Sequence, residues 1–174
     1  MGLVEVPQLP DGSPSEDELR WLVSIVRGLR VKSIFEIGTG TGETISFLAG
    51  QPTVEQAWTL DLPAAMAQAT RWPLLETDHR WIGLQKVELP GNVEQLWGDS
   101  ARFDFAPYYG RCDLVFVMGS HSAKYIFSDL RAARKMASKR GAVIWHGGTP
   151  SPVELVMAEY RLLLLSDRMG IVWR

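Results

Sequence analysis

The chain has 174 residues, a length that fits one domain of ordinary size and excludes a catalytic domain joined to a separate substrate domain. Its 18 Lys and Arg residues against 20 Asp and Glu residues give a net charge of -2, so the overall positive charge typical of nucleic-acid-binding proteins is missing. A single cysteine, Cys112, excludes an internal disulfide, and the longest aliphatic run, residues 162–165, is too short to span a bilayer. We therefore expect residues 1–174 to form a single domain of a soluble, cytoplasmic protein, with residues 1–14 as an N-terminal arm.

The first predicted element is a helix that begins after Ser15. This serine stands three residues before Glu18, the spacing of a capping box, in which each side chain accepts a hydrogen bond from the backbone of the other residue. Apolar residues then recur at helical intervals up to about residue 30, namely Leu19, Leu22, Val23, Val26 and Leu29. This helix should bury one face against the rest of the domain.

A strand, a glycine-rich loop, a helix and a second strand come next. The apolar run at residues 32–37 predicts a buried strand, residues 42–49 a helix, and residues 57–60 a second strand that ends in Asp61. This order is a βαβ unit, which places the two strands parallel in one sheet.

The middle of the chain gives a weaker pattern. Residues 63–98 contain a short helical pattern at 64–69, but prolines and glycines interrupt the rest of this segment. Residues 113–118 read as a central parallel strand, and residues 125–140 as a helix that closes with basic residues and Gly141.

The last part of the chain predicts a strand, a helix and a hairpin. Residues 142–145 form the strand, residues 153–160 the helix, and residues 161–165 and 171–173 the two strands of the hairpin. Strands that alternate with helices indicate an α/β sandwich, with the glycine loop at the carboxyl ends of its strands, where such sheets bind ligands.

The glycine loop is the most informative stretch of the chain. Glycines tolerate positive φ and leave room for a ligand close to the backbone, and the following helix can direct its N-terminal N–H groups at an anionic group. A dinucleotide-binding fingerprint needs G-x-G-x-x-G, whereas the third glycine arrives one residue early here. The loop therefore resembles motif I of the class I S-adenosylmethionine-dependent methyltransferases, and it reads Glu36-Ile37-Gly38-Thr39-Gly40-Thr41-Gly42.

Further segments extend this resemblance over roughly residues 32–148. Their order is similar to that of methyltransferase family 24, whose members methylate small molecules; the segments are Thr59-Leu60-Asp61-Leu62-Pro63, Gly98-Asp99-Ser100, Phe103-Asp104-Phe105, Tyr108-Tyr109-Gly110 and Gly119-Ser120-His121-Ser122. The resemblance implies a Rossmann-like sandwich with a mostly parallel seven-stranded sheet, an antiparallel hairpin at the C-terminal end and helices on both faces.

The resemblance also implies a set of residues that bind S-adenosylmethionine. Asp61, 19 residues after Gly42, would accept hydrogen bonds from the ribose hydroxyls, with Leu62 beside it. The loop residues Glu36, Gly38, Thr39, Gly40, Thr41 and Gly42 would hold the rest of the cofactor, and Asp99 and Ser100 would reach the adenine. We expect loop backbone donors or the cofactor's ammonium to satisfy Glu36. Two alternatives stay open: Asp61 as a capping acid at the end of a strand, and Gly-Asp-Ser as an ordinary turn.

Two positions depart from the family pattern. Metal-dependent relatives carry acids after the fourth and fifth strands, where this chain has Met118-Gly119 and His146-Gly147. A thioether and a glycine cannot replace carboxylates around a hard cation, so we expect no metal site. The aromatic residue expected soon after His121 is Ala123 here, which alters the pocket.

Two histidines remain for catalysis. His121 follows the fourth predicted strand and His146 follows the fifth, and a histidine can act as a general base near neutral pH. The alternative is that each histidine only caps a helix or bonds a loop.

The sequence thus favours an S-adenosylmethionine-dependent methyltransferase that acts on a small-molecule acceptor, at oxygen and without a metal ion. The alternative is a catalytically silent protein that binds S-adenosylmethionine or S-adenosylhomocysteine and has lost the metal-ligand acids. A third interpretation is an interaction module without cofactor binding, which the intact glycine loop and Asp61 oppose. Nucleic acid and membrane are not expected partners, and the N-terminal arm and first helix could cover the cofactor or form a homodimer contact.

Overall fold

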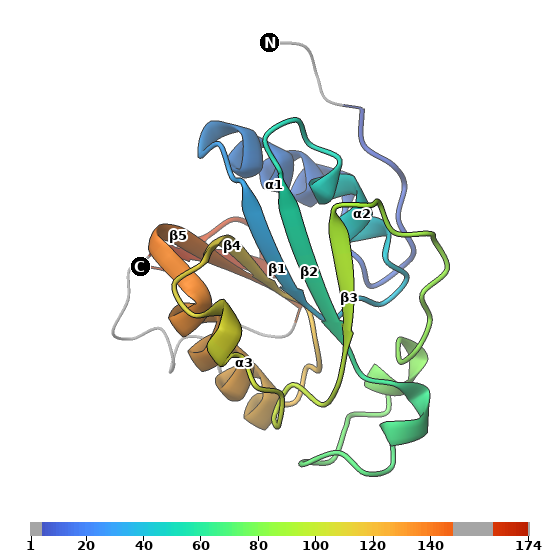
Figure 1. Cartoon of the computed structure of the whole chain (residues 1–174). Helices are drawn as coiled ribbons and strands as arrows, with labels where there is room; N and C mark the ends of the chain where they lie inside the picture. The colour runs from blue at the N-terminus through green and yellow to red at the C-terminus, as the bar shows by residue number, and fades with distance from the viewer. Residues whose placement is uncertain (1–4, 148–161, 174) are drawn as a thin grey trace.

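The computed structural model describes residues 5–147 and 162–173, and its centre is a mostly parallel sheet (Figure 1). Within these residues the sheet has seven strands in the order β3-β2-β1-β4-β5-β7-β6. Strands β1 to β5 pair in parallel, and β6 and β7 form an antiparallel hairpin, as predicted. The strands are β1 (Ser33–Ile37), β2 (Gln56–Asp61), β3 (Val93–Trp97), β4 (Cys112–Val117), β5 (Ala137–His146), β6 (Leu162–Leu164) and β7 (Met169–Trp173).

Helices cover both faces of the sheet. Figure 1 shows α1 (Glu16–Gly28) and α2 (Glu43–Ala49) over one face and α3 (Ala123–Met136) over the other. Successive strand residues point to opposite faces, so Leu114 and Phe116 pack with α1, while Val115 and Val117 pack with α3. Each face therefore has its own apolar core, as expected for central strands of a parallel sheet.

The predicted capping box of α1 is confirmed. Glu18 donates its backbone N–H to the Ser15 hydroxyl at 3.3 Å, and Ser15 donates its N–H to the Glu18 carboxylate at 2.8 Å. The predicted apolar stripe is buried from residue 19 to residue 26, but Leu29 is 47% exposed because α1 ends at Gly28. Arg30 then takes a positive φ of 52°, which turns the chain toward β1.

Helix α3 begins two residues before the predicted start at residue 125 and ends four residues before the predicted end at residue 140. It starts at Ala123 and stops at Met136, and the next residue, Ala137, is extended and pairs with Cys112. The basic residues predicted to close the helix at 139 and 140 therefore belong to β5. Pairing resumes between Leu114 and Ala142, so the residues in between form a bulge.

The segment between β2 and β3 lies at the carboxyl ends of the parallel strands (Figure 1). The helical pattern at residues 64–69 gives only a short 3₁₀ turn, η1 (Ala64–Met66), and a second turn, η2 (Asp78–Arg80), comes after it. A third turn, η3 (Ala106–Tyr108), precedes β4. Strand β3 was not predicted as an element, and the helix predicted at 153–160 lies outside the described residues.

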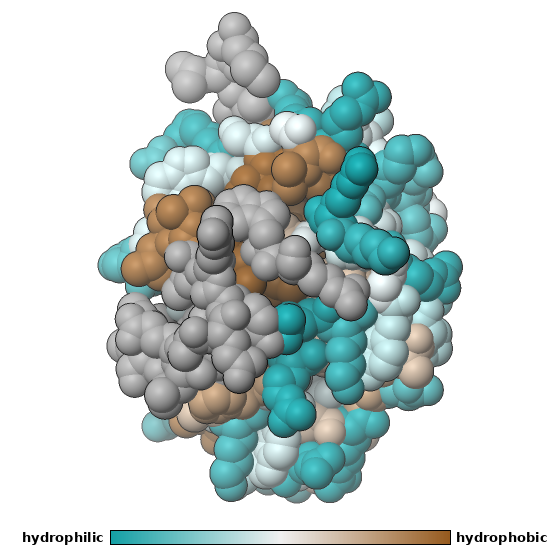
Figure 2. Space-filling model, turned by 90° about the vertical axis from the view of Figure 1, so that its left-hand side faces the viewer, coloured by the Kyte–Doolittle hydropathy of each residue, from teal (hydrophilic) through white to brown (hydrophobic). Residues whose placement is uncertain are grey.

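The hairpin forms one edge of the sheet. Leu163 and Leu164 of β6 are about half exposed, and Figure 2 shows apolar surface on this side of the molecule. No helix within the described residues is long and apolar enough to cross a bilayer.

Candidate functional site

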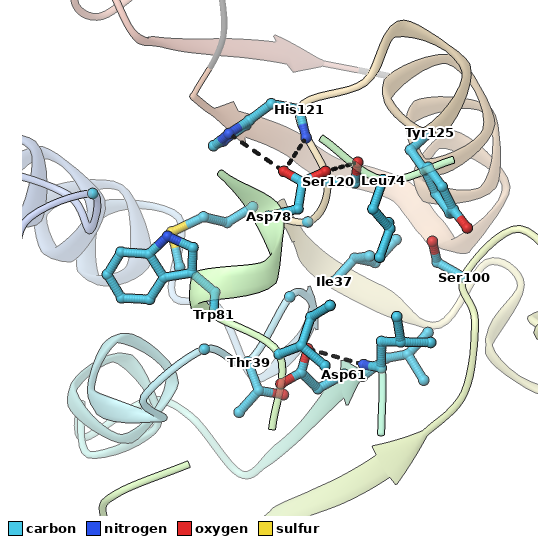
Figure 3. Close-up of a pocket in the computed structure, with 18 of the residues that line it drawn as sticks. Ile37, Thr39, Asp61, Leu74, Asp78, Trp81, Ser100, Ser120, His121 and Tyr125 are labelled. Carbon is cyan, nitrogen blue, oxygen red and sulfur yellow. Dashed lines mark hydrogen bonds and ion pairs between the residues drawn. The ribbon is translucent and has the colours of Figure 1, made fainter. Parts of the chain in front are cut away.

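A cavity opens at the carboxyl ends of the parallel strands (Figure 3). Its lining comes from the glycine loop after β1, from the ends of β2, β3 and β4, from the start of α3 and from the segment between β2 and β3. Residues of the N-terminal arm, Gly12 and Ser13, also line it. The cavity is therefore where an open α/β sheet is expected to bind a ligand.

The glycine loop needs its glycines because of backbone conformation and crowding. Gly38, Gly40 and Gly42 have φ values of 98°, 53° and 86°, which other residues rarely adopt. A side chain at Gly38 would collide with the Met118 backbone, because the loops after β1 and β4 cross there. The loop can therefore present its backbone directly to the cavity.

A chain of buried hydrogen bonds supports the loop from below. The Thr59 hydroxyl donates to Glu36 Oε2 at 2.6 Å, so it can accept the bond from Thr39, whose hydroxyl lies 2.8 Å away. Gln95 Nε2 then donates to Thr39 at 3.1 Å. Within the protein, the partner of Glu36 is thus a threonine hydroxyl of the neighbouring strand β2 and not the loop backbone, which was one of the two donors that we expected.

Glu36 retains one free oxygen. Its Oε1 is buried with no hydrogen-bond partner in the described part of the chain, and burial raises the pKa of Glu36 to about 8. A positively charged donor next to this oxygen would favour the ionised form of the carboxyl group.

Asp61 carries a similar open position at the end of β2. Its Oδ1 accepts a hydrogen bond from the Leu62 N–H at 2.9 Å, while Oδ2 has no partner among the described residues. Burial raises the pKa of Asp61 to about 7, an effect that the Leu62 hydrogen bond and, more weakly, the nearby Gly83 N–H, which does not reach hydrogen-bond geometry, partly offset. Because Asp61 lines the cavity, a ligand with hydroxyl donors would complete its hydrogen bonding.

Asp99 is held by donors of the protein itself. Its carboxylate accepts hydrogen bonds from the Arg71 N–H at 2.7 Å, the Tyr125 hydroxyl at 2.9 Å and the Ala101 N–H at 3.0 Å. Burial, more than the hydrogen bond to Asp99, raises the pKa of Tyr125 to about 12. This phenol therefore keeps its proton at neutral pH. Asp99 therefore ties α3 and the segment after β2 to the end of β3.

The loop after β4 carries His121 into the cavity (Figure 3). Asp78, from turn η2, accepts a hydrogen bond from the Ser120 hydroxyl at 2.6 Å and one from the His121 backbone N–H at 3.2 Å. The ring Nδ1 of His121 lies 3.9 Å from Asp78 Oδ1, too far for a hydrogen bond but close enough for an ion pair. On its other side the ring lies against Gly147, where a Cβ atom would collide with it.

His146 lies elsewhere. Its Nε2 is 3.3 Å from Glu18 Oε2 and 3.3 Å from an Arg168 nitrogen, and its ring is buried between α1 and the hairpin. Burial lowers the pKa of His146 to about 4, so the ring is neutral at pH 7. The Ser166 hydroxyl also donates a hydrogen bond to Glu18 Oε1 at 2.6 Å. Glu18, His146 and Ser166 together therefore link α1 to the hairpin.

The structure brings most of the predicted site residues together. The predicted residues that line the cavity are Gly38, Thr39, Gly40, Thr41, Asp61, Leu62, Asp99, Ser100 and His121. The remaining three do not line it: Glu36 lies beneath the loop, Gly42 begins α2, and His146 is the buried residue described above.

Several lining residues were not predicted from the sequence. Asp78, Trp81 and Leu74 come from the segment without a clear period, and Tyr125 is an apolar-face residue of α3. Trp81 covers the glycine loop together with the arm, since a Cβ atom at Gly12 would come within 2.6 Å of the Trp81 ring. The only sequence signal was the excess of tryptophans in this part of the chain.

The described residues contain no group of three or more His, Cys, Asp or Glu side chains arranged to hold a metal ion. Met118 and Gly119 line the cavity at the end of β4, and Gly147 follows β5 with a φ of 89°. At these two positions the chain therefore carries a thioether and no side chain.

Comparisons with known proteins give structural neighbours only. No family model matches the chain, and no curated protein matches it. The SAH-bound methyltransferase PaMTH1 of Podospora anserina superposes with a TM-score of 0.64 at 17% identity, over 94% of this chain and 81% of that chain. The O-methyltransferase TomG of Streptomyces achromogenes, in complex with SAM, gives 0.64 at 18% identity, over 95% and 82%.

An enzyme that is not named as a methyltransferase has a similar fold. Spermidine synthase from Thermotoga maritima superposes with a TM-score of 0.59 at 14% identity, over 92% of this chain and 61% of that chain. At these identities the likeness establishes the fold, a Rossmann-like sandwich of the kind found in methyltransferases, and the site must decide the function.

Proposed function

We propose that this chain is an S-adenosylmethionine-dependent methyltransferase that acts on a hydroxyl group of a small molecule without a metal ion. The observation that carries the proposal is Asp61, which ends β2 in the wall of the cavity beside the glycine loop and has one buried oxygen, Oδ2, without a hydrogen-bond partner among the described residues. Structural neighbours crystallised with SAH and SAM support the choice of cofactor.

The residues of the cavity fit this cofactor. Asp61 would accept hydrogen bonds from the ribose hydroxyls, and a carboxylate is well suited to two neighbouring donors. Glu36 lies beneath the loop and outside the cavity lining, so its proposed part is to support the loop through Thr59 and Thr39. Asp99 and Ser100 would border the adenine, with Asp99 acting mainly through the chain segments that it fixes.

His121 is the residue that we assign as general base. S-adenosylmethionine supplies an electrophilic methyl group when it is bound. The imidazole of His121 lines the cavity with its side chain 35% exposed, so it can accept the proton that an acceptor hydroxyl loses. His146 has no such access, and its lowered pKa makes it a weak base, so we leave it out of this role.

The absence of a metal from the proposed reaction rests on the side chains at two positions. Met118 offers a soft thioether, and Gly147 offers no ligand, at the positions where hard oxygen donors would be needed. Positioning of the acceptor and proton removal can account for methyl transfer without a Lewis acid.

A labelled-methyl assay tests the proposal. The purified protein would be incubated with S-adenosylmethionine and a panel of small phenols and alcohols, with EDTA in one arm and Mg²⁺ in the other. We expect methyl transfer to oxygen that EDTA leaves unchanged. Turnover that requires Mg²⁺ would overturn the metal-free mechanism, and transfer of a group other than methyl would assign the chain to another enzyme class of this fold.

A silent binding protein is the remaining alternative from the sequence. It would bind S-adenosylhomocysteine but transfer no methyl group to any acceptor of the panel, and the assay together with a binding measurement separates the two.

A further inference from the structure

Asp78 is buried in a segment that is otherwise largely exposed. Its side chain is 7% exposed, whereas its neighbours Glu76 and His79 are exposed. Burying a carboxylate is costly unless donors satisfy it, so its place in the wall of the cavity requires specific partners.

Those partners belong mainly to the loop that carries His121. Asp78 Oδ2 accepts hydrogen bonds from the Ser120 hydroxyl at 2.6 Å and the Leu75 N–H at 2.9 Å. Asp78 Oδ1 accepts one from the His121 N–H at 3.2 Å, and the same oxygen faces His121 Nδ1 at 3.9 Å. One carboxylate thus fixes the backbone of the loop and places its charge beside the ring (Figure 3).

The opposite edge of the ring lies against Gly147. A Cβ atom at this position would overlap His121 Nε2 and lie 2.9 Å from Cδ2, so only glycine leaves room for the ring. The imidazole is therefore confined between Asp78 and Gly147, with Nδ1 directed to the carboxylate and Nε2 away from it.

We propose that Asp78 is the positioning residue for His121, holding its ring in the cavity and keeping the neutral ring protonated on Nδ1. A negative charge beside Nδ1 favours a proton there, which puts the lone pair of the neutral ring on Nε2, the nitrogen that faces Gly147. The catalytic purpose of this assignment rests on the proposed function. The contacts between Asp78 and His121 do not depend on that function.

Imidazole ¹⁵N NMR at pH 8 on the protein without added ligand tests the assignment. His121→Gln and His79→Gln identify the signals. We expect wild-type His121 to be mainly the Nδ1–H tautomer, and Asp78→Asn to shift it toward the Nε2–H form that free imidazole side chains favour. Glu76→Gln removes an exposed acid two residues away and is the matched control, with an unchanged His121 signal. Ser120→Ala removes one bond to Asp78 but keeps the charge, so the tautomer should persist.

A wild-type His121 that is mainly Nε2–H would overturn the assignment even if Asp78→Asn did not fold. An unchanged tautomer in folded Asp78→Asn would do the same. Calorimetric titration of the same samples with S-adenosylhomocysteine distinguishes failure of the two proposals. If the protein binds S-adenosylhomocysteine but His121 is not the Nδ1–H tautomer, only the role of Asp78 is rejected. If His121 is the Nδ1–H tautomer but the protein does not bind S-adenosylhomocysteine, the proposed function is rejected.

Discussion

The ring of His121 occupies the space that a side chain at position 147 would need. The residues come from different loops, after β4 and after β5, and a Cβ atom at Gly147 would overlap His121 Nε2. A histidine in this pose and a carboxylate at position 147 therefore exclude each other. The absence of a side chain at position 147 is thus a steric requirement of the histidine that we propose as base.

Replacing Gly147 by alanine should destabilise the protein and displace His121. The residue has a φ of 89°, which costs a non-glycine residue about 1–3 kcal/mol, and the added methyl group collides with the ring. Urea denaturation should show a loss of at least this size. Gly91→Ala is the control, because a Cβ atom at Gly91 meets nothing within 4 Å. Equal stability of both variants would contradict the described contact.

Glu36→Gln should change how stability depends on pH. Burial raises the pKa of Glu36 from 4.5 to about 8, so the unfolded chain loses the proton first and wild-type stability falls as pH rises through this window. A glutamine has no proton to lose. Between pH 5 and pH 9 the free energy of unfolding of the variant should therefore rise by about 2–4 kcal/mol relative to that of the wild type. Denaturant titrations across this range measure the difference. Glu76→Gln is the control for removal of a carboxyl group, and a difference that does not change with pH would be incompatible with a buried, protonated Glu36.

His146→Gln should reduce the sensitivity of the fold to acid. Burial lowers the pKa of His146 from 6.5 to about 4, so the unfolded chain takes up the proton first as the pH falls. The stability that the neutral ring contributes is present above pH 6.5 and is lost as the pH falls toward 4. Thermal or urea unfolding between these values should show a shallower decline in the variant, with His79→Gln as the control for the substitution. A decline as steep as that of the wild type would show that His146 is not buried as described.

Trp81 should report on occupation of the cavity. Its indole lies over the glycine loop and lines the cavity, so S-adenosylhomocysteine should change its fluorescence. Trp81→Phe should abolish most of the change. Trp21→Phe, which removes a tryptophan on the exposed side of α1, should retain it. A fluorescence change that persists in Trp81→Phe and disappears in Trp21→Phe would place the ligand away from the cavity beside the arm.

The interior of the fold could be predicted from the sequence. Strands β1, β2 and β4 are buried on both faces, so each reads as an apolar run, and the capping box marks the start of α1. Strand β3 was missed because it is only partly buried and its sequence, VEQLW, is half polar. The end of α3 was misplaced because residues after Met136 have good helix propensity, while pairing with β4 pulls Ala137 into the sheet.

The residues that line the cavity at the glycine loop and at the strand ends could be predicted because they follow strands at fixed spacings. Asp78 could not, since it lies in a segment without periodicity and its partners are 42 and 43 positions away in the chain. The separation of His121 and His146 was also hidden, because His121 follows β4 and His146 ends the neighbouring strand β5, yet the structure places one in the cavity and buries the other against Glu18.

Calorimetric titration with S-adenosylhomocysteine and S-adenosylmethionine, on the wild type and on Asp61→Asn, tests the central claim most directly. The substitution keeps the size of the side chain but removes the charge that would bind the ribose hydroxyls. We predict saturable binding to the wild type, no binding of NAD, and an affinity lower by about tenfold or more in the variant. Absence of binding to the wild type, or equal affinity in the variant, would contradict the proposed function.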